Sequence, residues 1–241
     1  MSAADWPRRG WGLIAALWRF VRRFEIRVLI AVALIAGALN LFIELGDDVG
    51  EGDYSDLDRR LILMMRTPGD PTDPIGSRSI EEAVRDMTAL GGTLVVTLVT
   101  IIAVLAFAFH NRWKHALVMG GGVLLATLSI DLTKALYGRP RPDLVPHGSY
   151  VYSGSFPSGH SAMAAATFLI LAVLISSLEP RRRTKALAYG VAAAVLVAAG
   201  VSRVYLGVHW PSDVVAGWCL GSVWALAAFA VLRLIGGRTR G

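Results

Sequence analysis

Charged residues are scarce in this chain. Asp, Glu, Lys and Arg make up 17% of its 241 residues, whereas a water-soluble domain carries about a quarter. Hydrophobic residues make up 54% of the chain, and the mean hydropathy is +0.54. This balance disfavours a soluble domain and predicts a membrane protein.

Cysteine and metal-binding patterns are also nearly absent. Cys219 is the single cysteine and lies inside an apolar run, so an internal disulfide is excluded and a packed thiol is expected. The chain has neither an H-E-x-x-H motif nor the clustered carboxylates of a metal centre, so we expect no metal and no other cofactor. It also lacks an internal repeat, a low-complexity tract and a long linker. We therefore expect residues 1–241 to form one domain.

The apolar residues are concentrated in six runs. Each has about 18 or more residues, enough for a helix to cross the roughly 30 Å hydrocarbon core of a bilayer. The predicted fold is therefore all-α, an integral membrane bundle of six transmembrane helices. Arginines before the first run resemble a signal peptide, but the run continues past a weak cleavage cue, so we expect an uncleaved helix. The approximate runs are Val28 to Leu45, Met87 to Phe109, Ala116 to Leu136, Ser161 to Leu178, Ala186 to Leu206 and Val214 to Ile235.

The positions of the basic residues predict how this bundle lies in the membrane. Arginines crowd the N-terminal stretch 1–27, and basic residues also occupy the connections between runs two and three and between runs four and five, and the end of the chain. Because basic loops stay in the cytoplasm, we expect both termini to be cytoplasmic in an inner (plasma) membrane. The formal net charge of +6 is thereby explained without a nucleic-acid partner.

The connection at residues 46–86 is acidic instead. It holds eleven acidic residues against five arginines, which suits the extracytoplasmic side. The stretches YSDLDRRLILMMR and SIEEAVRDMTALGG have the spacing of amphipathic helices, and TPGDPTDPIGS between them favours turns. Two interpretations stay open for this segment: a solvated loop that lies on the headgroups, and a lid that guides substrate.

Three stretches carry polar residues that membrane helices rarely tolerate. They are DLTKALYGRPRPD from Asp131, FPSGHSA from Phe156 and SRVYLGVHWPSD from Ser202. With the topology above, all three fall at the extracytoplasmic ends of their spans. We therefore expect a polar site at that face, built from residues 134–213.

The residue types in these stretches suit a phosphate group. Guanidinium forks match the tetrahedral oxygens of phosphate. Ser158 and Gly159 stand at a helix start, which adds a hydroxyl, an approachable amide and the positive end of a helix dipole. The sequence thus predicts an anion cradle. Its cations are Lys134, Arg139, Arg141 and Arg203.

Two histidines flank this cradle. His209 lies four residues before Asp213, with Pro211 between them at a first helical turn. If that turn bends back, Asp213 can accept a hydrogen bond from one ring nitrogen and leave the other as a nucleophile aimed at phosphorus. His160 would lie opposite as a general acid, a role that typically contributes about 10²–10⁴-fold. The remaining histidines are expected to be polar anchors at the membrane interface: His110, His115 and His147.

The three stretches together resemble the signature of the type 2 phosphatidic acid phosphatase superfamily, also called lipid phosphate phosphatases. That signature is K-x6-R-P, then P-S-G-H, then S-R-x5-H-x3-D. This sequence reads KALYGRPRP from Lys134, PSGH from Pro157 and SRVYLGVHWPSD from Ser202. Every specified position is filled, in the right order and with the right internal spacing.

The resemblance implies a metal-free phosphatase built as a six-helix membrane bundle with its site at the outer face. By position, His209 would form a phosphohistidine, Asp213 would orient it, and His160 would protonate the leaving group. Arg139 lies outside the fixed positions of the signature and is expected only to support the site. The implied phosphate-binding set is Lys134, Arg141, Ser158, Gly159 and Arg203.

The expected partner is a lipid phosphate substrate within the membrane phospholipids. Bacterial members of the family act on phosphatidylglycerophosphate, phosphatidic acid, undecaprenyl pyrophosphate or the phosphates of lipid A. Hydrolysis of such a headgroup is the leading hypothesis, and two alternatives stay open: a lipid phosphotransferase that uses the same phosphohistidine, and a phospholipid transporter without chemistry. The headgroup, the tail and the oligomeric state are left open.

Two features within the third run are not part of the signature. Asp131 lies three residues before Lys134 on one helical face, so we expect the two to pair in a structural role. The glycines at 120–122 are expected to permit close helix packing.

Overall fold

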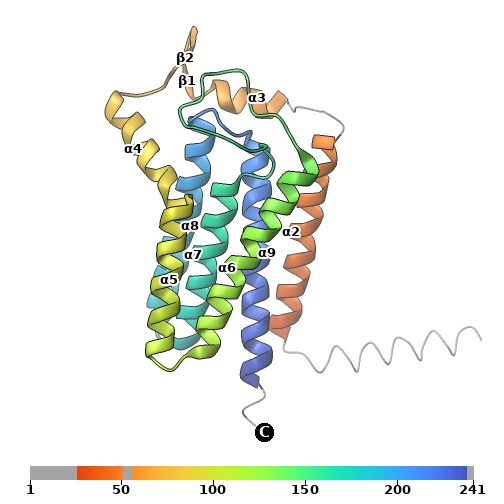
Figure 1. The fold of residues 1–241 in the computed structure, drawn as a ribbon, viewed down its shortest axis with the longest axis vertical. Coiled ribbons are helices and arrows are strands. Elements are labelled where there is room, and N and C mark those ends of the chain that lie inside the picture. The colour runs from red at the N-terminus through yellow and green to blue at the C-terminus, as the bar shows by residue number, and fades with distance from the viewer. Residues whose placement is uncertain (1–25, 51–55, 238–241) are drawn as a thin grey trace, which may run out of the picture.

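Long helices dominate the computed structural model, which describes residues 26–50 and 56–237. Five of them are long and apolar enough to cross a membrane, and a bent pair makes a sixth candidate span. They run side by side along the long axis of the molecule (Figure 1). The predicted all-α membrane bundle is confirmed. The five are α2 (Ile26–Gly50), α6 (Trp113–Tyr137), α7 (Gly159–Leu178), α8 (Arg182–Tyr205) and α9 (Pro211–Gly237).

The sixth candidate span differs from the predicted run between Met87 and Phe109. It consists of α4 (Arg78–Thr88), the 3-10 turn η1 (Ala89–Gly91) and α5 (Thr93–Phe109), and it is bent by 48°. Gly92 adopts an extended backbone with φ −74° and ψ 153°, which breaks the helix before α5. The charged residues of α4 favour water over hydrocarbon, so the apolar helix begins six residues later than the sequence suggests.

The acidic connection forms a cap over one end of the bundle (Figure 1). It contains α3 (Asp56–Leu63) and an antiparallel ribbon of β1 (Arg66–Thr67) and β2 (Asp70–Pro74). Gly69 has φ 88° in the ribbon turn, a conformation that favours glycine. The turn-rich stretch was expected, but the ribbon was not. Ile62 of α3 is fully buried and anchors the cap.

Helix α7 lies at the centre of the bundle and packs against α5, α6, α8 and α9. Its closest partner is α9, where two glycines stand four residues apart. A Cβ added at Gly217 would stand 2.7 Å from the Ser158 carbonyl oxygen, and one at Gly221 would stand 2.5 Å from that of Ala162. These glycines therefore let the two backbones touch, as small residues do in membrane helix pairs.

The predicted role of the glycines at 120–122 holds for Gly122 alone. A Cβ at Gly122 would stand 2.9 Å from Ile170 Cδ1, whereas one at Gly120 would make an ordinary contact of 3.5 Å with Val104 Cγ2. Gly121 faces open space. Cys219 is partly buried beside apolar side chains, as a packed thiol.

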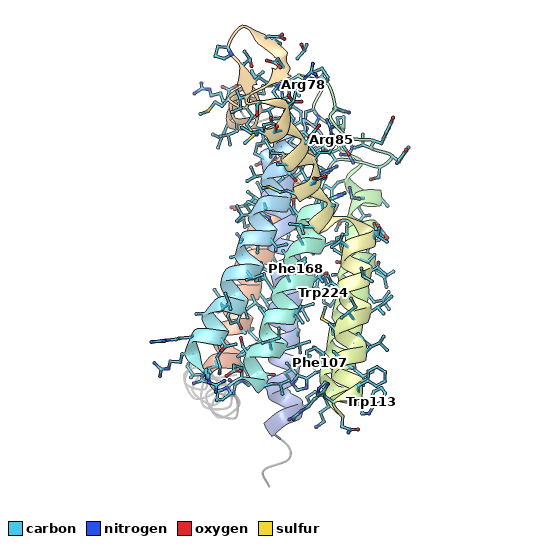
Figure 2. All side chains as sticks on the ribbon, turned by 90° about the vertical axis from the view of Figure 1, so that its left-hand side faces the viewer. Arg78, Arg85, Phe107, Trp113, Phe168 and Trp224 are labelled. Atoms are coloured by element: carbon cyan, nitrogen blue, oxygen red, sulfur yellow. The ribbon has the colours of Figure 1, made fainter. Side chains whose placement is uncertain are left out.

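The two ends of the bundle differ in their connections. The labelled arginines Arg78 and Arg85 mark α4 at the capped end, and Phe107 and Trp113 mark the turn between α5 and α6 at the other (Figure 2). Of the predicted basic stretch 1–27, residues 1–25 lie outside the described residues, as do residues 238–241 at the other terminus.

Candidate active site

Two local backbone signals bring the polar stretches to the capped end. Helix α6 ends at Gly138, whose left-handed φ of 56° turns the chain away from the helix axis. Helix α9 begins at Pro211, a residue favoured at the first helical position. Between α6 and α7, residues 138–158 cross this end of the bundle (Figure 1). The ends of α6 and α8 and the starts of α7 and α9 thus meet there.

Asp213 is the most connected side chain of the site, and it is fully buried. Its Oδ1 accepts a hydrogen bond of 2.6 Å from Arg139 Nη1. Its Oδ2 accepts one of 2.9 Å from the Trp210 backbone N–H and a short one from Ser155 Oγ. The same Oδ2 lies 3.4 Å from His209 Nδ1. These four partners fix the carboxylate and aim one oxygen at the imidazole.

The hydrogen-bond partners of His209 assign its tautomer. Its Nε2 lies 3.1 Å from Arg141 Nη1, and a guanidinium can only donate, so Nε2 must accept with its lone pair. The proton of the neutral ring is then on Nδ1, which faces Asp213. The ring is 2% exposed, and burial lowers the pKa of His209 to about 4 although Asp213 opposes this shift. At neutral pH the imidazole is therefore uncharged.

Lys134 and Arg141 shape the loop beside this imidazole. Lys134 Nζ donates a hydrogen bond of 2.7 Å to the Gly154 carbonyl. Arg141 Nε donates one of 3.0 Å to the Ser153 carbonyl, and its Nη1 donates one of 2.6 Å to the Val208 carbonyl. Both side chains are partly exposed, so both cations can reach an anion at the site.

Arg203 is 2% exposed at the end of α8. Its Nη1 donates a hydrogen bond of 3.0 Å to Thr88 Oγ1. Its Nε is buried without a hydrogen-bond partner among the described residues. Buried N–H groups normally have partners, so this orphan donor suits an anionic ligand.

The start of α7 forms the opposite wall. Ser158 caps the helix and accepts hydrogen bonds from the Ser161 backbone N–H and hydroxyl at 3.4 and 2.8 Å. A Cβ at Gly159 would stand 3.6 Å from Lys134 Cε, so the Lys134 side chain passes over the helix start. His160 follows in the first turn, next to Gly92.

The site residues expected from the sequence therefore converge. The side chain of His160 interacts electrostatically with those of Arg203, His209, Lys134 and Arg141. Ser158 joins the two motifs directly, because its backbone N–H donates to the Asp213 carbonyl at 2.9 Å. Their roles as nucleophile, general acid and phosphate ligands stay predictions.

Two expectations about neighbouring residues become more specific. Asp131 is exposed and interacts with Lys134 electrostatically, but no close ion pair joins them in the described part of the chain, and Lys134 bonds to the Gly154 carbonyl. Arg139 is 4% exposed and bonds directly to Asp213, so the support it gives is to the carboxylate. The other histidines lie in local contacts, for example His147 Nε2 with the Pro142 carbonyl at 2.8 Å.

Three further residues of the site were not predicted. Ser155 precedes the P-S-G-H stretch and bonds to Asp213. Ser212 falls on an unspecified position of the last motif and bonds to Arg139 Nη1 at 2.8 Å. Asp58 comes from the acidic cap and bonds to both Ser212 and Arg139. Nothing in the pattern around Asp58 distinguishes it from its exposed neighbours.

Comparison with known proteins decides the family. The model of the PAP2 superfamily matches residues 113–235. Phosphatidylglycerophosphatase B of Bacillus subtilis is 34% identical over 148 residues, which cover 59% of this chain and 70% of that protein.

The chain belongs to the PAP2 superfamily.

A solved PAP2 structure has a similar fold. A transmembrane PAP2-type phosphatidylglycerolphosphate phosphatase from Bacillus subtilis superposes with a TM-score of 0.68 at 25% identity, covering 86% of this chain and 97% of that one. A lipid A 1-phosphatase of Rhizobium etli is 34% identical over 43% of this chain, which spans 44% of that protein. The predicted multi-pass membrane phosphatase of the PAP2 type is confirmed at this level. The matched region includes every motif residue but neither α3 nor α4.

Proposed function

We propose that this PAP2 protein hydrolyses a phosphate from the headgroup of a membrane lipid through a phosphohistidine at His209. The observation that carries the proposal is the pair of contacts at the two ring nitrogens, from which the tautomer is assigned. Asp213 holds Nδ1, and the lone pair of Nε2 faces Arg141. A nucleophile presented among phosphate-binding cations is what phosphoryl transfer to nitrogen requires.

In the first step, His209 Nε2 attacks phosphorus and the bond to the leaving oxygen breaks. The ring gains positive charge as the N–P bond forms, and the Asp213 carboxylate stabilises that charge through the Nδ1–H hydrogen bond. His160, in its protonated form, gives a proton to the departing lipid oxygen. A bound phosphate dianion beside His160 favours that protonated form.

In the second step, a water molecule attacks the phosphohistidine. Neutral His160 accepts a proton from this water as the new P–O bond forms and the N–P bond breaks. Phosphate leaves, His209 returns to its neutral tautomer, and His160 is protonated again. Atoms and protons thus balance over the cycle.

The cations lower the barrier by stabilising the negative oxygens of the transferring group. Arg203 supplies the buried Nε that has no partner in the described part of the chain. Lys134 and Arg141 are held in place by carbonyls of the 153–154 loop. Ser158 and Gly159 add the positive end of the α7 dipole.

The location of the site at one end of the bundle supports a lipid substrate and an outer-face site. The phosphate would lie at the level of the headgroups while the tail of the lipid stays in the hydrocarbon. Moving the tail into water would cost about 0.8 kcal/mol per CH₂. The turn between α5 and α6, at the other end, carries Arg112 and Lys114. By the positive-inside rule this end is cytoplasmic and the site is extracytoplasmic.

A panel of lipids tests the function. Purified protein in nanodiscs is given phosphatidylglycerophosphate, phosphatidic acid, undecaprenyl pyrophosphate or lipid A, and free phosphate is measured with and without EDTA. We expect phosphate release from at least one lipid without an added acceptor and without loss in EDTA. If phosphate transfer requires an acceptor lipid, the protein is a phosphotransferase. If none of the lipids is turned over, the hydrolase proposal is wrong and transport is favoured.

Impermeant maleimide tests the orientation. In a Cys219→Ser background, cysteine is introduced at Tyr152, which is 94% exposed beside the site, or at Asn111 in the α5–α6 turn. We expect intact cells to be labelled at position 152 and not at 111. The reverse pattern would place the site in the cytoplasm.

A further inference from the structure

Asp58 is an unusual acid for an exposed cap. It lies on α3, where its neighbours Asp56, Leu57 and Arg59 are exposed, yet Asp58 is 3% exposed. Burying a carboxylate is costly unless it is paired and hydrogen-bonded. Its contacts therefore show what fixes α3 to the bundle.

These contacts lead to the start of α9. Asp58 Oδ1 accepts a hydrogen bond of 2.8 Å from the Ser212 backbone N–H, and Oδ2 accepts one of 2.5 Å from the Ser212 hydroxyl. Ser212 N–H is one of the first amides of α9, which lack partners within the helix. Asp58 thus caps a helix that is distant in sequence, and its charge favours the positive end of that helix.

Asp58 also reaches the carboxylate of the site through one guanidinium. Arg139 Nη2 lies 3.3 Å from Asp58 Oδ2, and Arg139 Nη1 lies 2.6 Å from Asp213 Oδ1. Arg139 stacks over the Trp210 ring, with Cζ 5.4 Å from its centroid. A continuous path of hydrogen bonds therefore runs from Asp58 through Arg139 and Asp213 to His209.

We propose that Asp58 is a positioning residue for the reaction, acting through Arg139 on the Asp213–His209 pair. The proposal rests on the function above. Because two carboxylates share one guanidinium, Asp213 is only partly neutralised and keeps the negative charge that stabilises the imidazolium of the phosphohistidine. Without the charge of Asp58, Arg139 would bind Asp213 more tightly and weaken its hold on His209.

This role argues against the lid interpretation for α3. A lid that opens at each turnover would break the contacts of Asp58 each time and leave the buried Arg139 guanidinium without one of its two carboxylates, which is strongly unfavourable. We therefore expect α3 to stay in place during turnover and any mobile part of the cap to lie outside it.

The test compares Asp58→Asn with Asp56→Asn, a matched change two residues away on the exposed face of α3. We expect Asp58→Asn to lower kcat by about 10–100-fold with KM changed by less than about three-fold, the range typical for a lost outer-shell partner. Asp56→Asn should match the parent in kcat and in melting temperature. Equal kcat for the two variants in folded protein would overturn the proposal.

A double-mutant cycle tests whether Asp58 acts through Arg139. If it does, Asp58→Asn in an Arg139→Gln background should lower kcat by less than about two-fold further, because the path is already cut. Full additivity of the two losses would contradict the proposed path. Should Asp58→Asn fail to fold, Asp58→Glu in the same cycle carries the test, because it keeps the charge and shifts the carboxylate.

Nitrogen-15 NMR of histidine-labelled resting protein separates this proposal from the phosphohistidine mechanism. Asp58→Asn should shift the His209 Nδ1 resonance toward that of a weaker hydrogen bond, and Asp56→Asn should not. That result would stand even if His209 proved not to be the nucleophile. An unchanged Nδ1 resonance in Asp58→Asn would contradict the positioning role.

Discussion

The capped end of the bundle and its other half are both tightly packed, but they bury different kinds of side chain. Toward the uncapped end, α5, α6, α7 and α9 share an apolar cluster that includes Met119, Ile170 and Leu174, each fully buried. The capped end also has a buried apolar cluster around Ile62 and Trp210, but most of the buried polar side chains of the described residues lie there, among them Asp58, Arg139, Ser155, Ser158, Arg203, His209 and Asp213. A substitution in the apolar half can therefore change packing without changing the active site. At the capped end the same side chains contribute to packing and to the proposed reaction.

Folding and catalysis therefore depend on different kinds of interaction. The apolar half consists of interchangeable side chains whose contacts are individually small. The polar end depends on specific donors and acceptors, each with a partner that would be left buried and unpaired by its loss. Substitutions should therefore separate into those that lower stability and those that lower kcat.

The largest expected effect comes from Asp213→Asn. The change keeps the size of the side chain but removes the charge that holds the His209 tautomer, and a comparable change in a Ser-His-Asp triad costs about 10⁴-fold in kcat. We expect a loss of that order, measured as phosphate release from the preferred lipid. Asp143→Asn, an exposed change in the neighbouring loop, is the control, and a loss below about ten-fold in Asp213→Asn would refute the orienting role.

The next largest effect is expected for His160→Gln. Loss of the general acid should lower kcat by about 10²–10⁴-fold on a lipid, whose leaving alkoxide needs a proton. On p-nitrophenyl phosphate, whose leaving group is stable as an anion, the first-turnover release of p-nitrophenol should be nearly unchanged, whereas steady-state turnover should still fall because His160 also activates the water of the second step. Equal losses in the first-turnover rate on both substrates would show that His160 does not protonate the leaving group, and His147→Gln serves as the matched control.

Leu174→Ala tests the apolar half. It should lower the free energy of unfolding by about 2 kcal/mol, the low end of the range for buried leucines, because lipid tails are as apolar as the core and lost packing dominates. The kcat of the folded fraction should not change. Leu124→Ala, on a side chain that is 59% exposed, should have little effect in the same denaturation assay, and a fall in kcat for Leu174→Ala would break the separation.

The smallest expected effect is that His209 does not titrate between neutral pH and pH 5.5. Burial holds the pKa of His209 at about 4, below the ordinary value of about 6.5, so the neutral nucleophile persists as pH falls and is lost only near pH 4. Carbon-13 NMR of labelled histidines, with His209→Gln for assignment, should show a neutral ring at pH 5.5. A ring that titrates near 6.5 would show that burial does not lower the pKa of His209.

Much of this site was predictable because residues that act together are also close together in the sequence. P-S-G-H places a cap, a glycine and a histidine within one turn, and H-x3-D places two partners across the start of α9. The apolar runs likewise predict the spans, since hydrophobic length is a local property. The amphipathic stretch that ends at Gly92 was predicted and corresponds to α4 and η1, but the apolar run was started too early, at Met87, because the last residues of that stretch are themselves apolar.

The contacts of Asp58 and Arg139 could not be predicted in this way. They join α3 to the start of α9 and to the loop that follows α6. Their pairing depends on how the cap packs on the bundle, which the spacing of residues along the sequence does not predict. Asp131 shows the opposite limit. Its spacing from Lys134 brings the two charges close enough to interact, but it could not predict that Lys134 donates its hydrogen bond to a backbone carbonyl of the loop.

The central claim is that the phosphoryl group is carried by His209. Acid-labile phosphate trapped by rapid quench during turnover, followed by mass spectrometry of the peptide that contains residue 209, tests it most directly. We predict phosphate on His209 in the parent protein, increased accumulation in His160→Gln with p-nitrophenyl phosphate, and none in His209→Ala. Phosphate on another residue, or turnover that persists in His209→Ala, would contradict the account.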